Sequence, residues 1–457
     1  MKKKVPPVRI LGVRLASLPL IKKLTTEVRN MKYNQNERIL QITEKTLIVG
    51  IDVGSETHYA RAFNFRGVEF GKVLKFNNDV EGFEELAKWS GKIAKEQNFS
   101  KITVGMEPTG HYWFSIAEFI KEKGMKLVLV NPHHVKKSKE LDDNNPSKTD
   151  RKDPKTIAML IKDGRYMEPY IPEGVYKELR TAMETRWHIM KELTAIKNRV
   201  CRWIHIYYPE FNKVFADWEG KAALLILNEC PTPKKVLEKG IEGLIAIWRR
   251  HKIRTVGRKR AVKLIESAEF SVGCREGLVS AENDLLMLLE DYHRKTEQLE
   301  RTLALIENLA MQVPGFEKLL EIKGIGLVTA AGFIAEVGDV NRFEHPKQIQ
   351  KLAGLSLKEN SSGKHKGKTT ICKRGRKRLR YYLTFGIMPL LSKNEEFRQL
   401  HQYYTTRENR PLKKMQSLVA LSNKLIRIFY ALLTKQTAYD PQKMMNDIKR
   451  AELLKVA

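Results

Sequence analysis

The first convincing strand of this chain is the apolar run Leu47-Ile48-Val49-Gly50-Ile51, which leads directly into Asp52-Val53-Gly54. A short, uninterrupted apolar run of this kind is typical of a strand buried on both faces of a sheet. An aspartate directly after such a strand stands where desolvation of its charge is costly, so it needs a partner or a function. The stretch therefore predicts a buried strand with Asp52 directly at its end.

The elements expected after this strand follow a recognisable order. The predicted strands cover 59–65, 68–76, 102–106 and 127–130, and the predicted helices cover 80–97, 112–123 and 154–162, with a polar loop before the last helix. Three antiparallel strands followed by α/β units is the order of the ribonuclease H-like (RuvC-like) fold. We therefore predict an α/β domain of this class over residues 46–172.

The rest of the chain is predicted to be mostly helical. Long helices are expected over 178–207 and 282–309 within a helical linker spanning 173–312, and the second helix has the apolar spacing of a coiled-coil or bundle seam. This seam could pack on its own chain or on a second copy. The remaining predicted parts are a C-terminal domain at 313–440, a basic extension at 1–45 and a tail at 441–457.

The composition points to an anionic partner. Of 457 residues, 83 are Lys or Arg and 53 are Asp or Glu, so the formal net charge is +30. Nucleic acid is the first-choice partner for such a charge and an anionic membrane surface is the second. The four cysteines are too widely spaced for a zinc pattern, and no run approaches the roughly 20 apolar residues of a membrane span. We expect a cytoplasmic, nucleoid-associated protein that does not enter a membrane.

The first thirty residues hold eight Lys or Arg and allow two interpretations. They could form a basic arm that touches nucleic acid. Alternatively, they could precede a working start at Met31.

Four carboxylates follow predicted strands or precede a predicted helix. Asp52 ends the first strand, Glu107 follows the strand over 102–106, and Asp150 and Asp153 precede the helix over 154–162. In a ribonuclease H-like sheet these positions meet, and hard oxygen ligands suit Mg²⁺ or Mn²⁺. A pair of such ions can stabilise both oxygens of a phosphoryl transfer. Singly, Asp153 could instead cap a helix, Asp150 could be a loop charge and Glu107 a turn residue.

A serine and two glycines in the C-terminal region complete the candidate residues. Ser362 precedes Gly363 and a run without acids that holds nine cations, namely Lys364, Lys366, Lys368, Lys373, Arg374, Arg376, Lys377, Arg378 and Arg380. The serine could attack a phosphodiester or only donate a hydrogen bond to phosphate. Gly324 and Gly326 bracket one apolar residue, as in a helix-hairpin-helix that binds phosphate through backbone amides, or in a packing turn.

These motifs resemble the IS110 and IS1111 families of insertion-sequence transposases. The resemblance covers residues 46–164 through the acidic motifs, and residues 319–391 through Gly324-Ile325-Gly326, Leu352-Ala353-Gly354-Leu355, Ser362-Gly363 and Lys373-Arg374-Gly375. It implies a DNA recombinase in which Asp52, Glu107, Asp150 and Asp153 bind metal and Ser362 is the nucleophile. It also implies donor and target double-stranded DNA, a noncoding guide (bridge) RNA from the element, and a homo-oligomer, dimeric and then tetrameric on synapsis. Pro154, directly after the last acid, departs from the family pattern.

The expected reaction passes through a covalent phosphoserine link between protein and DNA. Two other interpretations stay open. One is a metal-only RuvC-like endonuclease or junction resolvase in which water attacks and Ser362 only binds phosphate. The other is a non-catalytic RNA-binding scaffold, in which the acids would not matter.

Overall fold

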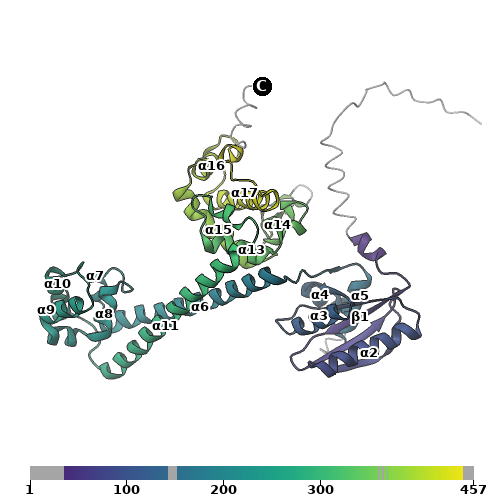
Figure 1. The fold of residues 1–457 in the computed structure, drawn as a ribbon, viewed down its shortest axis with the longest axis horizontal. Coiled ribbons are helices and arrows are strands. Elements are labelled where there is room, and N and C mark those ends of the chain that lie inside the picture. Colours follow the sequence, from purple (N-terminus) through teal and green to yellow (C-terminus); the bar gives the residue numbers. More distant parts are fainter. Residues whose placement is uncertain (1–34, 143–151, 359–360, 363–364, 368, 446–457) are drawn as a thin grey trace, which may run out of the picture. The chain divides into compact units, whose positions relative to one another are not determined.

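The computed structural model describes residues 35–142, 152–358, 361–362, 365–367 and 369–445 (Figure 1). The chain divides into two compact units, residues 1–170 and 171–457. The first is a mixed α/β unit and the second is built mostly of helices.

One sheet organises the first unit. Its strands are β1 (Thr46–Asp52), β2 (Thr57–Phe63), β3 (Glu69–Asn77), β4 (Lys101–Met106), β5 (Lys126–Val130) and β6 (Tyr166–Met167). They lie in the order β3-β2-β1-β4-β5-β6, with β1 parallel to β4 and antiparallel to β2. This arrangement is compatible with a ribonuclease H-like domain.

Helices cover both faces of the sheet. They are α2 (Val80–Glu96), α3 (Trp113–Glu122), α4 (Pro132–Asp142) and α5 (Asp153–Lys162). Leu47, Val49 and Ile51 of β1 belong to the core shared with α2 and α3, while Ile48 packs with α4 and α5. The alternation follows from the two-residue period of a strand. It confirms the prediction of a buried strand, and it shows that the strand is covered on both faces.

Every strand and helix predicted between residues 47 and 162 is present, with ends within two residues of those expected. Helix α4 was not predicted, because the stretch between β5 and α5 was expected to be a polar loop. The two-residue strand β6, which follows α5, was not predicted either. Part of the predicted basic extension also belongs to this unit. Residues 35–40 are helical and Ile42 is buried in its core, whereas residues 1–34 lie outside the described residues.

Two long antiparallel helices form the frame of the second unit. They are α6 (Gly174–Tyr207) and α11 (Leu278–Met311), and they pack along each other (Figure 1). Leu285, Leu289 and Ile306 of α11, which belong to the predicted apolar seam, are fully buried. This part of the seam therefore packs within the chain.

Smaller helices surround each end of this frame. A helical lobe, residues 208–277, contains α7 (Phe211–Val214), α8 (Lys221–Glu229), α9 (Pro233–Arg250) and α10 (Arg258–Glu269). The C-terminal helices are α12 (Phe316–Leu320), α13 (Leu327–Val337), α14 (Pro346–Leu352), α15 (Lys377–Lys393), α16 (Glu395–Thr406), α17 (Lys414–Lys435) and α18 (Pro441–Met444). Met444, within the predicted tail, is buried in the C-terminal core.

Helix α17 corrects one expectation from the sequence. Its 22 residues are long and apolar enough to cross a membrane, whereas no run of that kind was expected. Leu421, Leu425 and Phe429 of α17 are nevertheless fully buried in the core of the second unit. An apolar helix packed in this way is a core helix and does not indicate a membrane protein.

Candidate active site

Three of the four predicted acids line a single cavity. Asp52, Glu107 and Asp153 border a space of about 690 Å³ at the ends of β1 and β4 and the start of α5. Asp150 lies outside the described residues. Residues separated by up to a hundred positions in sequence are thus brought to one place by the fold.

The register of the sheet places the first two acids together. Ile51 of β1 pairs with Met106 of β4 in the parallel ladder. Asp52 and Glu107 are each the next residue along their strands. Because neighbouring strands are about 4.8 Å apart, the two carboxylates leave the sheet at the same edge and side by side.

A pair of glycines brings the third acid close. Gly50 and Gly105 are partners in the β1–β4 register, and α5 packs on both. A Cβ atom on Gly50 would lie 2.0 Å from the carbonyl oxygen of Pro154, and one on Gly105 would lie 2.2 Å from Ile161. The start of α5, which carries Asp153, can therefore approach β1 only because this part of the sheet has no side chains.

The capping alternative for Asp153 is wrong. The N-cap of α5 is Lys152, which makes no side-chain capping bond, and Asp153 is the first helical residue with Pro154 after it. Asp153 instead faces the cavity that Asp52 and Glu107 line.

A buried histidine fixes the loop after Asp52. The Nδ1 atom of His58 accepts a hydrogen bond from the backbone N–H of Gly54 at 3.2 Å. The ring is fully buried between Phe76 and Phe83. Burial lowers the pKa of His58, and a hydrogen bond with Asn78 opposes this only in part. A neutral ring is what the Gly54 contact requires, since a protonated imidazole has no acceptor.

A lysine was missed by the sequence reasoning. Lys136 of α4 lines the same cavity as the acids. The signal for α4 was Asn131 before Pro132, since the Asn131 side chain accepts a hydrogen bond from the His133 N–H at 2.9 Å. Asparagine before proline is a typical helix start. The Lys136 cation is well placed to balance the charge of the acids or of a bound phosphate.

The donor atoms at this cavity suit a hard cation. Carboxylate oxygens are the ligands that Mg²⁺ and Mn²⁺ prefer. Among the residues that the structure describes, no group of three or more His, Cys, Asp or Glu side chains is close enough to hold a metal ion. The chemistry of the acids therefore fits a divalent ion, while a closed ligand cage is not formed by the described atoms.

Ser362 lies in the second unit, on a two-part antiparallel ribbon. β7 (Leu357–Lys358) pairs with β10 (Thr370–Ile371), and β8 (Ser361–Ser362) pairs with β9 (His365–Lys366). Ser362 is in register with His365. The serine is therefore presented by a strand and not by a helix, while Lys364 and Lys368 lie outside the described residues.

The motifs Leu352-Ala353-Gly354-Leu355 and Lys373-Arg374-Gly375 pack against each other at the base of this ribbon. The backbone N–H of Lys373 donates to the carbonyl of Gly354 at 3.0 Å. A Cβ atom on Gly375 would lie 2.4 Å from the carbonyl oxygen of Leu352, and Gly354 has a φ of +68°. Both glycines are therefore needed for the chain to enter and leave the ribbon side by side.

Three arginines of the basic run make contacts within the chain. Arg376 donates to the carbonyl of Glu336, Arg378 pairs with Glu184 at 3.0 Å, and Arg380 donates to Ala353 at 2.8 Å. Burial raises the pKa of Glu336, which its neighbours Arg180 and Arg378 oppose.

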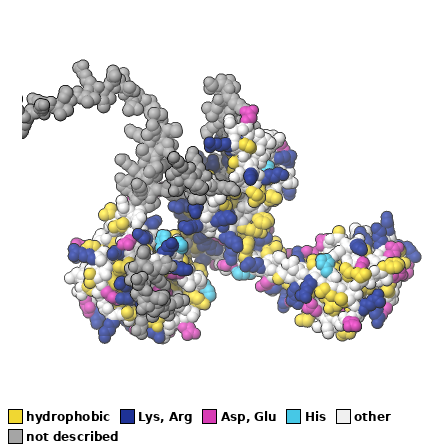
Figure 2. All heavy atoms as spheres, turned by 180° about the vertical axis from the view of Figure 1, so that it is seen from behind, with side chains coloured by type: hydrophobic (Ala, Val, Ile, Leu, Met, Phe, Trp, Pro, Cys, Tyr) yellow, Lys and Arg dark blue, Asp and Glu magenta, His cyan; other side chains and the backbone are white. Residues whose placement is uncertain are grey.

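Lys373, Arg374 and Lys377 of the same run are exposed. Figure 2 shows Lys and Arg side chains crowded on the face of the second unit seen there. These three are the described members of the run that are most accessible to a polyanion.

The two glycines at the start of α13 differ in their surroundings. Gly324 has a φ of +103°, and a Cβ atom there would lie 3.0 Å from the backbone of Leu390 in α15. Gly326 is the N-cap of α13 and would meet nothing within 4 Å. Gly324 therefore makes a packing turn, and Gly326 leaves the first turn of α13 accessible.

Two family models match the chain in regions that contain these sites. One, a DEDD model of the IS110 type described as a transposase, matches residues 49–209, and the other, described as the transposase IS116/IS110/IS902 family, matches residues 316–402. Together they cover more than half of the chain. The chain belongs to the IS110 family of transposases.

The transposase is similar to curated proteins over most of its length. It is 21% identical over 394 residues to the insertion element IS116 uncharacterized 44.8 kDa protein of Streptomyces clavuligerus, covering 86% of this chain and 96% of that one. It is 25% identical over 346 residues to a probable family 20 transposase of Pseudomonas aeruginosa, covering 74% and 86%. Over 125 residues it is 34% identical to the transposase for insertion sequence element IS1111A of Coxiella burnetii, covering 27% and 34%.

Membership of the family defines the general activity. The protein is the transposase of an insertion sequence, a DNA-recombining enzyme whose substrates are DNA. A DEDD domain also suggests a general dependence on divalent metal.

Proposed function

We propose that this transposase cuts and rejoins DNA with Ser362 as its nucleophile, assisted by an acidic site made of Asp52, Glu107, Asp150 and Asp153. The observation that carries the proposal is the single cavity lined by Asp52, Glu107 and Asp153. Three carboxylates that converge on one cavity of a strongly basic chain form a concave, charged site of the kind that binds a ligand.

The four acids would hold Mg²⁺ or Mn²⁺. When bound, such an ion supplies a Lewis acid that stabilises negative charge on a phosphate. The residues of the chain contribute the rest. The β1–β4 register holds Asp52 and Glu107 together, the glycine pair admits Asp153, and Lys136 adds a cation at the cavity.

The serine reaction conserves the number of phosphodiester bonds. The Ser362 hydroxyl oxygen forms a bond to the DNA phosphorus and loses its proton, while the bond to the leaving DNA oxygen breaks and that oxygen takes a proton. After strand exchange, a DNA hydroxyl attacks the phosphoserine and the serine is released. No nucleotide hydrolysis is needed, because the energy of the broken bond is kept in the covalent link.

The proposed partners follow from the resemblance to the IS110 family. Donor and target duplexes would contact Lys364, Lys366, Lys368, Lys373, Arg374, Arg376, Lys377, Arg378 and Arg380, together with the amides near Gly324 and Gly326. A noncoding RNA encoded by the element would select the DNA sites. A dimer, forming a tetramer on synapsis, would allow the serine and the acids of one site to come from different copies.

Trapping of a covalent adduct tests the nucleophile. Full-length protein is incubated with guide RNA, Mg²⁺ and labelled donor and target DNA, and adducts are resolved on denaturing gels. We expect Ser362→Ala to abolish the adduct and Ser361→Ala, its neighbour on β8, to keep at least about half of it. An adduct that persists in Ser362→Ala would refute the serine mechanism.

The acids are tested by strand cleavage in the same reactions. Asp52→Asn should lower cleavage by at least about a hundredfold, the range for loss of a group that stabilises transition-state charge. Glu96→Gln, exposed at the end of α2 and outside the cavity lining, is the control and should change cleavage less than about threefold. Cleavage without an adduct that survives Ser362→Ala would indicate the metal-only nuclease. Activity that is intact in Asp52→Asn and Glu107→Gln would indicate the RNA-binding scaffold.

A further inference from the structure

The helical lobe carries a dense group of cations in a region that neither family model covers. Residues 249–263, here called the basic segment, connect α9 to the first half of α10 and contain eight Lys or Arg and no Asp or Glu. All eight side chains are exposed, and they are Arg249, Arg250, Lys252, Arg254, Arg258, Lys259, Arg260 and Lys263.

Only part of this charge is balanced by the chain itself. Arg250 pairs with Glu229, and Arg258 pairs with Glu242 at 2.5 Å. Arg260 donates to the carbonyl of Val214. For the other five cations, the described residues include no acid within ion-pair distance. Exposed cations that repel one another without a counter-charge favour the binding of a polyanion.

The basic segment also forms one wall of a cavity of about 710 Å³. Lys221, Lys252, Arg254 and Arg260 line it, together with the start of α8. Asp217 is the single acid among the described residues that line it, and its Oδ1 already accepts a hydrogen bond from the Glu219 N–H at 2.9 Å. The helix start adds the positive end of the α8 dipole to the same space.

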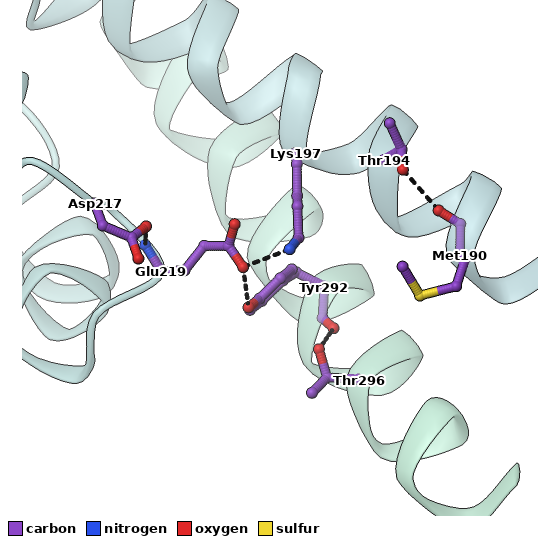
Figure 3. Close-up of polar contacts among 7 residues, drawn as sticks. All are labelled: Met190, Thr194, Lys197, Asp217, Glu219, Tyr292 and Thr296. Carbon is purple, nitrogen blue, oxygen red and sulfur yellow. Dashed lines mark hydrogen bonds and ion pairs between the residues drawn. The ribbon is translucent and has the colours of Figure 1, made fainter. Parts of the chain in front are cut away.

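The loop 215–220, which contributes part of the cavity lining, is held by the two long helices. Figure 3 shows the Glu219 carboxylate between Lys197 of α6 and Tyr292 of α11, at 2.5 Å and 2.9 Å. Burial, with the Glu219 contact, raises the pKa of Tyr292 to about 12. Trp218, in the same loop, is buried against the Tyr292 ring at 5.2 Å. The loop that borders the cavity is therefore anchored before any ligand binds.

We propose that the basic segment and this cavity bind the phosphate backbone of duplex DNA. The class of ligand follows from the cations. The duplex form follows from the small stacking surface, since Phe215 is buried and His251 is the single exposed ring among the described lining residues. Single strands and RNA loops are normally held by exposed aromatic side chains. The choice of DNA rests on the substrates of the family and does not require the serine chemistry.

The test measures the salt dependence of DNA binding by the full-length protein. Fluorescence anisotropy follows binding of a labelled 40-bp duplex without guide RNA over a series of NaCl concentrations. Each phosphate contact contributes roughly −0.9 to the slope of log affinity against log salt. Lys252→Ala with Arg254→Ala should flatten the slope by about two and weaken binding at 0.1 M salt at least about tenfold.

A matched pair removes the same charge elsewhere on the lobe. Lys234 and Lys239 are exposed on α9, outside the cavity lining. Their double alanine variant should change the affinity less than about twofold. Equal losses in the two double variants would overturn the proposal, because they would show a general effect of net charge.

An RNA duplex of the same sequence separates the two polyanions. A loss confined to the RNA duplex would also overturn the proposal. The adduct experiment reports on Ser362, whereas the salt slope reports on Lys252 and Arg254. Failure of the adduct experiment would therefore leave this inference intact, and unchanged salt slopes would refute it alone.

Discussion

At the scale of single residues, the most consequential contact near the site is made by a side chain that does not line it. His58 accepts the Gly54 N–H two residues after Asp52, and it can do so only while its ring is neutral. Gly54 itself has no room for a side chain, since a Cβ atom would lie 2.4 Å from the Thr57 carbonyl oxygen. The loop after Asp52 is therefore held by the His58 side chain and by the close approach of Gly54 to the Thr57 backbone.

The first prediction concerns the pH dependence of stability. The folded-state pKa of His58 is lowered, so below the unfolded-state value of about 6.5 the unfolded chain binds a proton that the folded chain resists. The free energy of unfolding should fall as the pH drops below about 6.5. At higher pH, His58 should no longer make the stability depend on pH. His58→Asn keeps an acceptor near Nδ1 and cannot titrate. Thermal unfolding at pH 7.5 and 5.5 should show a smaller loss in His58→Asn, and an equal loss would contradict the assignment.

At the scale of elements, the site depends on how closely α5 approaches the sheet. Gly50 and Gly105 form a flat area beside the ends of β1 and β4, and α5 lies on it with Asp153 in its first turn. The C-terminal helices use the same device, since a Cβ atom on Gly332 of α13 would lie 2.6 Å from the Tyr382 ring of α15. Glycines therefore permit close packing between elements in both units.

Gly50→Ala is the second prediction. The added methyl group collides with the Pro154 carbonyl, so α5 must move away from β1 and carry Asp153 with it. Overpacking of this kind costs about 1–3 kcal/mol of unfolding free energy, measured by urea titration. DNA cleavage should fall by at least about tenfold, since misplacing a catalytic group by an ångström can cost more than that.

Gly91→Ala provides the control for this change. Gly91 lies in α2, and a Cβ atom there would meet nothing within 4 Å. The substitution should therefore raise stability by about 0.5–1 kcal/mol, because alanine favours a helix more than glycine does, and leave cleavage unchanged. Normal cleavage by Gly50→Ala would show that the position of α5 does not matter for activity.

At the scale of the whole molecule, the two units have separate cores. Two apolar clusters of the described chain lie within residues 42–166, and the other two lie within residues 179–444. The first unit contains the three described acids, and the second contains the serine, the basic run and the helical lobe. Each unit therefore has the apolar content of an independent domain.

The third prediction is that residues 35–170 and 171–445 fold when produced separately. Each fragment should show a single cooperative thermal transition by circular dichroism, because no described cluster is divided by the cut. Neither fragment alone should form the protein–DNA adduct, since each lacks one half of the proposed chemistry. A fragment without a cooperative transition would show that its core needs the other unit.

The sequence by itself determined the order of elements and the family. The sequence was sufficient to predict the apolar run before Asp52, the alternation of strands and helices up to residue 130 and the long helices of the linker, because hydrophobic periodicity is a local property of the chain. The acids were readable for the same reason, since each of the three described ones stands at the end of a strand or the start of a helix.

Only the tertiary structure decided which residues meet. Gly50 pairs with Gly105, His58 accepts a hydrogen bond from the loop after Asp52, and Lys136 of α4 lines the cavity. These contacts depend on strand register and on the packing of distant segments, which no local sequence pattern contains. The same holds for Arg376, Arg378 and Arg380, three cations of the basic run whose partners Glu336, Glu184 and Ala353 are distant in sequence. Charge and hydrophobic periodicity are local properties of the sequence, whereas contacts between distant residues exist only after the chain has folded.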